Sequence, residues 1–270
     1  MIRSLLFLIL IFFCFRSYGK QIEVCPDCEI TSIKEGLAAC EAGDELVVRE
    51  GTYQEYELEI KKGIQVRGVG RPIIDGLKKG HVIKILSDSV SISGFRIINV
   101  GQSYTKDYAG IYLSKSDHFE IFDMILEDIF FGLLVEKSHF GKIYNNLISS
   151  NAIDEAGAGN GIHLWHCSDV TIEHNEIHHV RDGIYFEFVK NSIIQHNYSH
   201  DNIRYGLHFM FSNNDEYHHN TFVNNGAGVA VMFSKFITMT HNRFYKNWGT
   251  ASYGLLLKEI YDAEIEKNVF

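Results

Sequence analysis

Histidine is the residue type in this sequence that is most able to do chemistry, because the histidines are numerous and regularly spaced. The chain has 14 histidines, and 11 of them lie between residues 163 and 241. At intervals of 22 or 23 residues a histidine stands directly before an asparagine, at His174, His196, His219 and His241. If this interval is one turn of a repeating fold, the four imidazoles form a column. The column is either an architectural stack of rings or a set of ligands for a borderline metal such as Cu²⁺ or Zn²⁺. The same alternatives hold for a shorter column of His178 and His200.

A second group of candidate ligands follows from side-chain alternation along one repeated strand. Positions one and three residues after a recurring glycine are apolar, so positions two and four should point outward. Those outward positions include His163, His208, Met210 and Met232. Thioether and imidazole ligands together suit copper, particularly Cu(I). The alternative is that variable loops cover the methionines, and the insertion from Ser149 to Asn160 could fold over this face as a lid.

The repeat that would position these side chains begins near residue 80. A glycine followed by an aliphatic or near-aliphatic run recurs, most often 22 residues apart, at Gly80, Gly110, Gly132, Gly161, Gly183, Gly206, Gly228 and Gly254. Fourteen residues after the last six of these glycines stands an asparagine, at Asn146, Asn175, Asn197, Asn220, Asn242 and Asn268. The segment between glycine and asparagine keeps its length, whereas the segment that returns to the next glycine varies.

Three short strands in each turn predict an all-β fold, a single-stranded right-handed parallel β-helix with about 22 residues per coil. Stacked coils bury a continuous apolar core that one coil cannot bury alone. The recurring asparagines predict a ladder of side-chain amides inside a turn. The 2 prolines agree with this fold, because proline would remove a donor from a strand ladder.

The start of the solenoid is expected within residues 30–79. The segment from Thr31 to Cys40 fits a short helix capped by Thr31 or Ser32, with Glu35 completing a capping-box pattern. Such a helix would cover the exposed edge of the first coil. The first rungs are expected at Leu46–Val48, Leu58–Ile60 and Ile64–Val66.

An export signal is expected at the beginning of the chain. Arg3 precedes an apolar run from Leu5 to Phe15, which is shorter than the about 20 residues that a membrane span needs. Such a run suits a signal-peptide core, and the small residues Ser17 and Gly19 predict cleavage near Gly19. We therefore divide the chain into a signal peptide (1–19), an N-terminal segment and cap (20–45) and a β-helix (46–270). The mature protein is expected to be soluble and exported. Because the sequence stops at Phe270 inside a rung, we also expect the β-helix to be truncated at its C-terminus.

Four cysteines follow the predicted signal peptide. In an oxidising compartment, the Cys25-x-x-Cys28 pair favours a disulfide that staples the N-terminus, with Cys40 as an alternative partner. A thioredoxin-like redox pair and a soft-metal site are the other interpretations. Cys167 is expected to be a buried or unpaired thiol.

The charge of the chain argues against one class of partner. The formal net charge is −9, so non-specific binding to nucleic acid through a basic surface is not expected.

Two segments of the sequence resemble the NosD family. One runs from Arg204 to Ser212 (RYGLHFMFS), continues with Asn-Thr-Phe at 220–222, and ends with GAGVAVMFSK at 226–235. The other is the stretch GDELVVREGTY at 43–53. The resemblance covers about residues 30–270, which corresponds to the N-terminal two thirds of a family member.

The resemblance implies a periplasmic carrier protein without catalytic activity. It implies docking on a membrane ABC transporter, with its ATPase and permease, and a role in assembly of the copper-sulfide centre of nitrous oxide reductase. A copper chaperone lipoprotein would supply the metal and the reductase apoprotein would be the client. The implied metal is copper, and the oxidation state Cu(I) is favoured over Cu(II). The candidate ligands His163, His208, Met210 and Met232 come from the strand register and not from the family.

Two other functions fit a β-helix. A carbohydrate-active lyase, epimerase or hydrolase would place acids and basic groups along one outward strand, as Tyr185, Glu187 and Arg181 do beside the two histidines. Glycoside hydrolysis normally needs two carboxylates at one bond, whereas between the coils of Gly161 and Gly228 this strand face offers Glu187 alone. The methionines have no role in such chemistry. A structural, adhesin-like β-helix without a ligand is the third interpretation.

Overall fold

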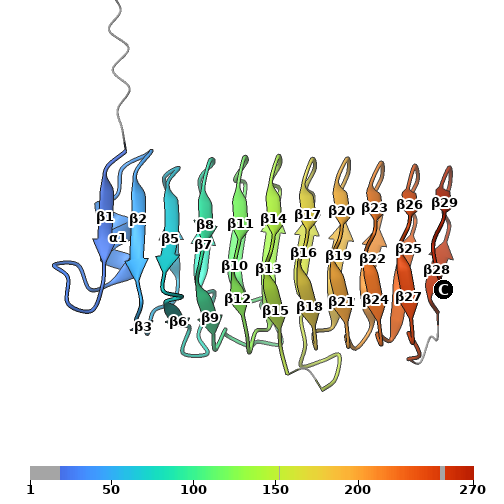
Figure 1. The fold of residues 1–270 in the computed structure, drawn as a ribbon, viewed down its shortest axis with the longest axis horizontal. Coiled ribbons are helices and arrows are strands. Elements are labelled where there is room, and N and C mark those ends of the chain that lie inside the picture. The colour runs from blue at the N-terminus through green and yellow to red at the C-terminus, as the bar shows by residue number, and fades with distance from the viewer. Residues whose placement is uncertain (1–18, 152, 250–252) are drawn as a thin grey trace, which may run out of the picture.

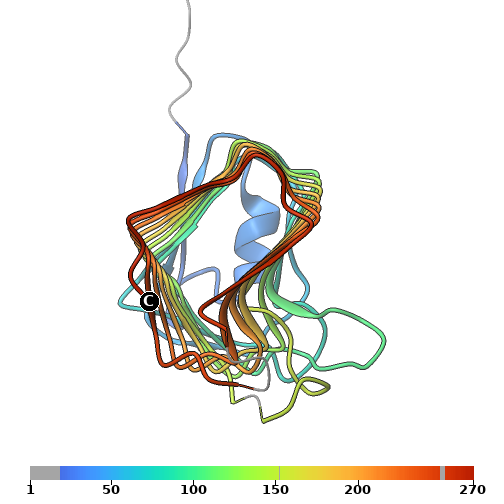
Figure 2. The same cartoon turned by 90° about the vertical axis from the view of Figure 1, so that its right-hand side faces the viewer.

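The protein is an elongated solenoid of stacked coils (Figure 1). The computed structural model describes residues 19–151, 153–249 and 253–270. Three parallel sheets run along the solenoid, and from β2 onward successive strands of the chain pass from one sheet to the next. Viewed along the axis, the coils superpose into one outline (Figure 2). The predicted parallel β-helix is therefore confirmed. The predicted signal peptide lies outside the described residues, apart from Gly19.

The first sheet, sheet A, has eleven strands. They are β1 (Gln21–Val24), β2 (Glu45–Arg49), β5 (Gln65–Val69), β8 (Ser91–Ser93), β11 (Glu120–Phe122), β14 (Lys142–Tyr144), β17 (Thr171–Glu173), β20 (Ile193–Gln195), β23 (Glu216–His218), β26 (Thr238–Thr240) and β29 (Glu264–Glu266). Strand β1 pairs in register with β2 and lies in the segment that the sequence analysis assigned to the N-terminal cap. The glycine–asparagine pattern does not predict this strand.

The other two sheets have nine strands each. Sheet B consists of β3 (Thr52–Tyr53), β6 (Ile73–Asp75), β9 (Arg96–Ile98), β12 (Ile125–Leu126), β15 (Leu147–Ser149), β18 (Glu176–His178), β21 (Tyr198–His200), β24 (Thr221–Val223) and β27 (Arg243–Tyr245). Sheet C consists of β4 (Leu58–Ile60), β7 (Ile83–Ile85), β10 (Ala109–Ser114), β13 (Phe131–Glu136), β16 (Ile162–Trp165), β19 (Asp182–Glu187), β22 (Tyr205–Met210), β25 (Ala227–Met232) and β28 (Leu255–Lys258).

The interior of the solenoid is a column of apolar side chains, as the alternation predicted. In sheet A the register aligns Ile121, Ile143, Ile172 and Ile194, and all four are fully buried. Each rung adds buried apolar area at about 25 cal/mol per Å², so stacking stabilises every coil through its two neighbours.

The predicted asparagine ladder is present inside the turn between sheets A and B. From Asn146 to Asn268, each side-chain amide donates to the Oδ1 of the asparagine in the next coil at 2.9–3.0 Å. Each Oδ1 also accepts from a backbone N–H of the preceding coil, as Asn197 Oδ1 does from Asn175 at 3.0 Å. A second, shorter ladder that the sequence analysis did not predict links Asn202, Asn225 and Asn247.

The N-terminal helix α1 (Ile33–Ala39) confirms the predicted cap and its N-cap residue. Ser32 Oγ accepts from the Glu35 backbone N–H at 3.4 Å. A second partner comes from outside the helix, because the Glu55 carboxylate accepts from the backbone N–H groups of Ile33 and Lys34 at 2.8 and 2.9 Å. A carboxylate at a helix N-terminus also interacts favourably with the helix dipole.

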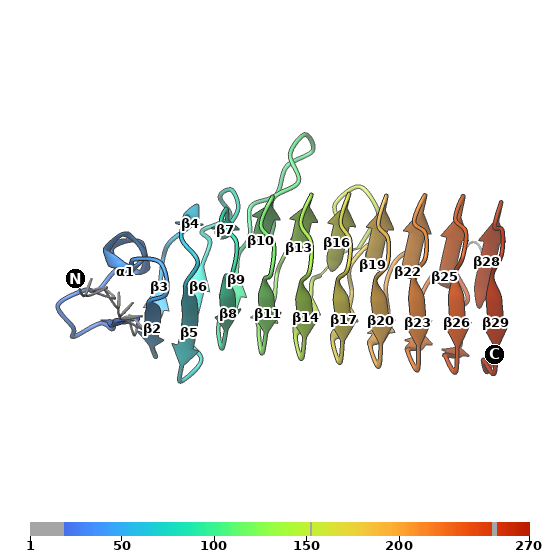
Figure 3. The same ribbon diagram turned by 90° about the horizontal axis from the view of Figure 1, so that it is seen from above.

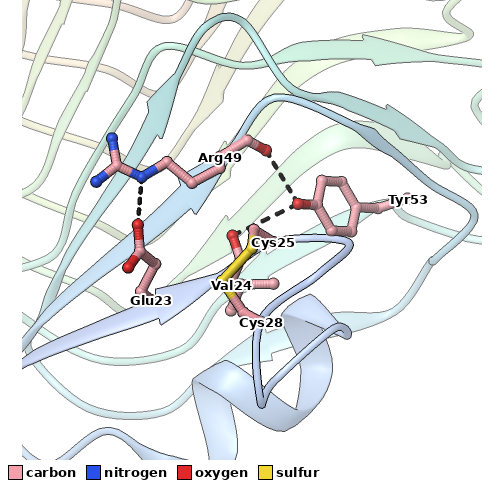
Figure 4. The surroundings of a disulfide bond; sticks show 6 residues. All are labelled: Glu23, Val24, Cys25, Cys28, Arg49 and Tyr53. Carbon is pink, nitrogen blue, oxygen red and sulfur yellow. Dashed lines mark hydrogen bonds and ion pairs between the residues drawn. A yellow bond between two sulfur atoms is a disulfide. The ribbon is translucent and has the colours of Figure 1, made fainter.

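The favoured disulfide between Cys25 and Cys28 is confirmed, and the alternative with Cys40 as a partner is not. Cys25 and Cys28 form a disulfide beside the end of β1 (Figure 4). Tyr53 lies next to it and donates its hydroxyl to the Arg49 carbonyl at 2.9 Å. Cys40 directly follows α1 as its C-cap and is a buried free thiol that donates to the Gly36 carbonyl. Cys167 is also buried and free.

The insertions lie where sheet B connects to sheet C, so the strands that carry candidate ligands keep a regular register. The two longest connections join β9 to β10 and β15 to β16. Both project from the same side of the solenoid, as the view from above shows (Figure 3). Within the described residues, no helix combines the length and the apolar character that a membrane crossing requires.

Candidate metal-binding face

The outward positions of sheet C form two columns, as the strand register predicted. In one column His163 pairs with Tyr185, Tyr185 pairs with His208, and His208 pairs with Ala230. In the other column Glu187 pairs with Met210, which pairs with Met232. Neighbouring strands of a sheet are about 4.8 Å apart, so these pairs are within contact distance.

Three of the four predicted ligands come together on this surface. Met210 and Met232 occupy adjacent coils, and His208 lies two residues before Met210 on the same face of β22. The Tyr185 hydroxyl donates to Met210 Sδ at 3.4 Å. We call His208, Met210, Met232 and Tyr185 the His–Met face.

The fourth predicted ligand, His163, is separated from the others by an aromatic ring. Tyr185 lies between His163 and His208, with ring centroids 4.6 and 4.8 Å from theirs and both contacts edge-to-face. His163 and His208 are therefore two coils apart, about 10 Å along the axis. One ion cannot contact both rings across that distance.

His208 has unused ligand capacity in a buried position. Its exposed fraction is 4%, and neither ring nitrogen has a hydrogen-bond partner within the described residues. The nearest charged atom is Asp182 Oδ2, 3.7 Å from Nδ1, which is beyond hydrogen-bonding distance. Burying an imidazole without hydrogen-bond partners is costly, and both ring nitrogens of His208 are left available to a ligand.

Asp182 and Arg204 form a buried pair next to His208, and the sequence analysis did not identify it. Arg204 donates from Nε to Asp182 Oδ1 at 3.0 Å and from Nη2 to Oδ2 at 2.7 Å. Burial raises the pKa of Asp182, but His208 and the Arg204 guanidinium outweigh it and hold the pKa below its ordinary value. The carboxylate is thus charged at neutral pH and favours a cation on the His208 ring. One feature of the sequence could have indicated this pair. The residue directly before the recurring glycine is an acid at Asp182, whereas it is Asn160 or Tyr205 in the neighbouring coils.

His163 is held in the neutral form that can donate a lone pair. Burial, with the nearby Arg181 charge, lowers the pKa of His163 to about 4. Its Nε2 is shielded from solvent and has no hydrogen-bond partner within the described residues. Its Nδ1 lies 3.4 Å from the Asn160 amide.

The insertion 149–160 lies beside this face. Asn160 accepts from Arg181 Nε at 3.2 Å, and Glu155 Oε2 lies 3.9 Å from Arg204 Nη1. The insertion therefore contacts the basic residues that flank His163 and His208. Met210 and Met232 remain partly exposed.

The second predicted column, at the turn between sheets A and B, is a stack of exposed rings. The centroids of His174, His196 and His219 are 5.0 Å apart, with planes within 3° of parallel, and His241 continues the stack at 4.8 Å. Imidazole lone pairs lie in the ring plane, so parallel rings direct them side by side and not toward one point. All four residues adopt a positive φ of 55–58° directly before the asparagine ladder.

The shorter predicted column acquires acidic neighbours that the sequence analysis did not identify. His178 and His200 are paired across β18 and β21, and Glu176 and Asp201 lie beside them. The sequence does contain an indication of the Glu176 contact. The spacing Glu-x-His in β18 places both side chains on one face of the strand.

Fold and site together define a parallel β-helix protein with a thioether–imidazole face on one outer sheet. Residues 144–270 match the family model "Periplasmic copper-binding protein (NosD)". This match includes the 204–235 segment and confirms its resemblance to the NosD family.

Two curated proteins are similar to parts of the chain. One is the "Probable ABC transporter binding protein NosD" of Pseudomonas aeruginosa, 28% identical over 112 residues, which are 41% of this chain and 26% of that protein. The other is the "SHC SH2 domain-binding protein 1 homolog A" of Xenopus laevis, 29% identical over 157 residues, which are 56% of this chain and 21% of that protein. The matches therefore span about a quarter of the length of these relatives.

Solved structures with the same architecture come from proteins of several functions. The polygalacturonase of Erwinia carotovora ssp. carotovora superposes with a TM-score of 0.69 and 11% identity, over 93% of this chain and 95% of that one. The surface adhesin PfbA of Streptococcus pneumoniae has a TM-score of 0.66 and 12% identity, over 87% and 74%. The A-module of the mannuronan C-5 epimerase AlgE6 of Azotobacter vinelandii has a TM-score of 0.60 and 10% identity, over 88% and 92%. At such identities the likeness concerns the fold alone.

Proposed function

We propose that this protein is a periplasmic copper-handling accessory protein of an ABC transporter, acting in assembly of the copper-sulfide centre of nitrous oxide reductase. The family match over residues 144–270 supports the copper-related role, and the name of the Pseudomonas relative supports the transporter association. The proposed partners are the transporter ATPase and permease, a copper chaperone lipoprotein and the reductase apoprotein. The protein acts as a carrier and not as a catalyst.

The observation that carries this proposal is the convergence of His208, Met210 and Met232 on one face. Two thioethers and one imidazole form a soft ligand set that suits Cu(I) better than Cu(II). Copper is cargo here, so the partial exposure of Met210 and Met232 is useful, because a donor and a client must both reach the ion. The edge-on ring of Tyr185 closes one side of the face, and the Asp182 carboxylate favours the positive charge. His163 lies too far away to share this ion and would act as a separate contact for copper.

Cu(I) affinity of the mature protein, measured by competition with a chromogenic chelator, tests the assignment. We expect Met210→Leu plus Met232→Leu to weaken Cu(I) binding about 10- to 100-fold, because both thioether ligands are lost while side-chain volume is kept. The matched control is Met124→Leu plus Met239→Leu, which changes two methionines buried in the core. Equal affinity in the wild type and the first variant would remove the site from the His–Met face.

A carbohydrate-active enzyme is the second candidate, because proteins of that class share the fold. Between β16 and β22, Glu187 is the accessible carboxylate on the outer face of sheet C, since Asp182 is fully buried in its pair with Arg204. Incubation with polygalacturonate and with polymannuronate, followed by analysis of reducing ends and uronate epimers, separates the two functions. Turnover that is lost in Glu187→Gln would support the enzyme.

A further inference from the structure

A second cluster of ligand-type side chains lies on sheet B, away from the His–Met face. Glu176 and His178 share the outer side of β18, and His200 is the register partner of His178 on β21. One ligand atom from each of the three residues lies within 4.8 Å of the other two. Small side-chain rotations would bring these atoms to the about 2.0–2.2 Å metal–ligand distances of a zinc-type site.

The His200 ring is already held in the orientation that a metal ligand requires. Its Nδ1 contacts Asp201 Oδ2 at 2.5 Å, and its Nε2 faces Glu176 Oε1 at 3.4 Å. Asp201 is itself held by a hydrogen bond from the Asn224 side-chain amide. Metal-bound histidines commonly donate their second ring N–H to a carboxylate in this way, which fixes the tautomer and makes the ligating nitrogen more basic.

His178 and Glu176 supply a second imidazole and a mobile carboxylate. The His178 ring is partly buried on the outer side of β18. The His178 Nδ1 lies 2.8 Å from the Nδ1 of His179, which leaves the other ring nitrogen for a ligand. Glu176 is half exposed and can swing toward an ion.

We propose that Glu176, His178 and His200 bind a borderline divalent cation of the Zn²⁺ class, with Asp201 as the positioning residue. Two imidazoles and one carboxylate leave a fourth tetrahedral position for water or for an external ligand. This site goes beyond the proposed copper-carrier function. Its ligand set contains no sulfur, so it favours Zn²⁺ or Cu²⁺ over Cu(I), and it occupies a different sheet from the His–Met face.

Zinc affinity of the whole mature protein, measured by isothermal titration with Zn²⁺ alone, tests this site. We expect His178→Gln plus His200→Gln to weaken Zn²⁺ binding at least 10-fold. The matched control His196→Gln plus His219→Gln removes two histidines from the exposed stack and should leave the affinity unchanged. Because Glu176 is half exposed, Glu176→Gln should fold normally and still weaken binding about 10-fold.

The positioning role of Asp201 needs a readout beyond affinity. Asp201→Asn should weaken Zn²⁺ binding about 10- to 100-fold and alter the visible spectrum of bound Co²⁺, and Asp201→Glu should restore both. An unchanged Co²⁺ spectrum in Asp201→Asn would overturn the positioning role.

Two outcomes would overturn the site itself. If the two histidine double variants lose Zn²⁺ affinity equally, binding is spread over the surface histidines. If Glu176→Gln keeps full affinity, the carboxylate is not a ligand. Failure here is distinguishable from failure of the copper proposal, because His178→Gln plus His200→Gln should leave Cu(I) affinity unchanged, whereas Met210→Leu plus Met232→Leu should leave Zn²⁺ affinity unchanged. A Cu²⁺ titration of the same variants should follow the zinc pattern with tighter binding.

Discussion

The His–Met face and the stack of His174, His196, His219 and His241 use the same residue type in opposite ways. In the stack, exposed rings lie parallel and contact each other. On the His–Met face, His208 is buried, meets Tyr185 edge-on and lies beside the Asp182–Arg204 pair. A repeat therefore aligns histidines in both places, but the neighbours from other columns decide whether the nitrogens are free to bind an ion.

Among the substitutions that test this difference, Asp182→Ala is expected to have the largest effect on the free energy of unfolding. Asp182→Ala removes the buried partner of Arg204 and the charge beside His208, whereas no residue of the stack has such a partner role. We expect a loss of about 3–5 kcal/mol in the free energy of unfolding, because one charge of a buried pair is left uncompensated. Urea denaturation followed by circular dichroism measures this loss. A loss below about 1 kcal/mol would show that the pair does not support the face.

The next effect separates the histidine stack from the asparagine ladder beside it. Asn220 accepts from the backbone N–H and side-chain amide of Asn197 and donates to the Ile194 carbonyl and to Asn242. Asn220→Ala should cost about 2–4 kcal/mol, because several buried polar groups lose their partners. The adjacent exposed change His219→Gln serves as the control. Equal losses for the two variants in thermal unfolding would contradict the assignment of stability to the ladder.

A pH-dependent effect should distinguish His163 from the stack. Its folded pKa of about 4 is below the ordinary value of 6.5, so the unfolded chain takes up a proton first as the pH falls. This contribution to stability is present above pH 6.5 and is lost between about pH 6.5 and 4. His163→Gln should remove about 1–3 kcal/mol of this dependence, measured as the difference from the wild type in urea unfolding at pH 7 and pH 4.5. His241→Gln is the comparison variant, and an identical pH profile for wild type and His163→Gln would contradict the burial of this ring.

The smallest effect is expected from the stack itself. His196→Gln plus His219→Gln should change the free energy of unfolding by less than about 1 kcal/mol, because exposed side chains contribute little. Binding of Cu²⁺ or Zn²⁺ should also stay unchanged if the rings only stack. A clear loss of metal affinity in this variant would make the stack a ligand set and would remove the contrast with the His–Met face.

Much of the fold could be predicted because a parallel β-helix is a repeat in one dimension. The constant spacing from Gly206 to Asn220 sets the strand register, and register alone places Met210 beside Met232 and one asparagine above the next. Strand β1 was missed because it lies before the repeat and has no glycine or asparagine of the pattern. The free state of Cys40 could not be predicted from spacing, because it depends on where folding places the thiol, which is buried and bonded to the Gly36 carbonyl.

The sequence by itself determined the columns of side chains, because a fixed coil length translates sequence position directly into height along the axis. Only the tertiary structure decided which columns meet. It placed Tyr185 between His163 and His208, paired Asp182 with Arg204, and set Glu176 and Asp201 beside His200. These contacts depend on side-chain rotamers, on burial and on the path of the chain at the corners, which a pattern of residue types does not record. For the same reason, the histidines were visible in the sequence while their separate roles were not.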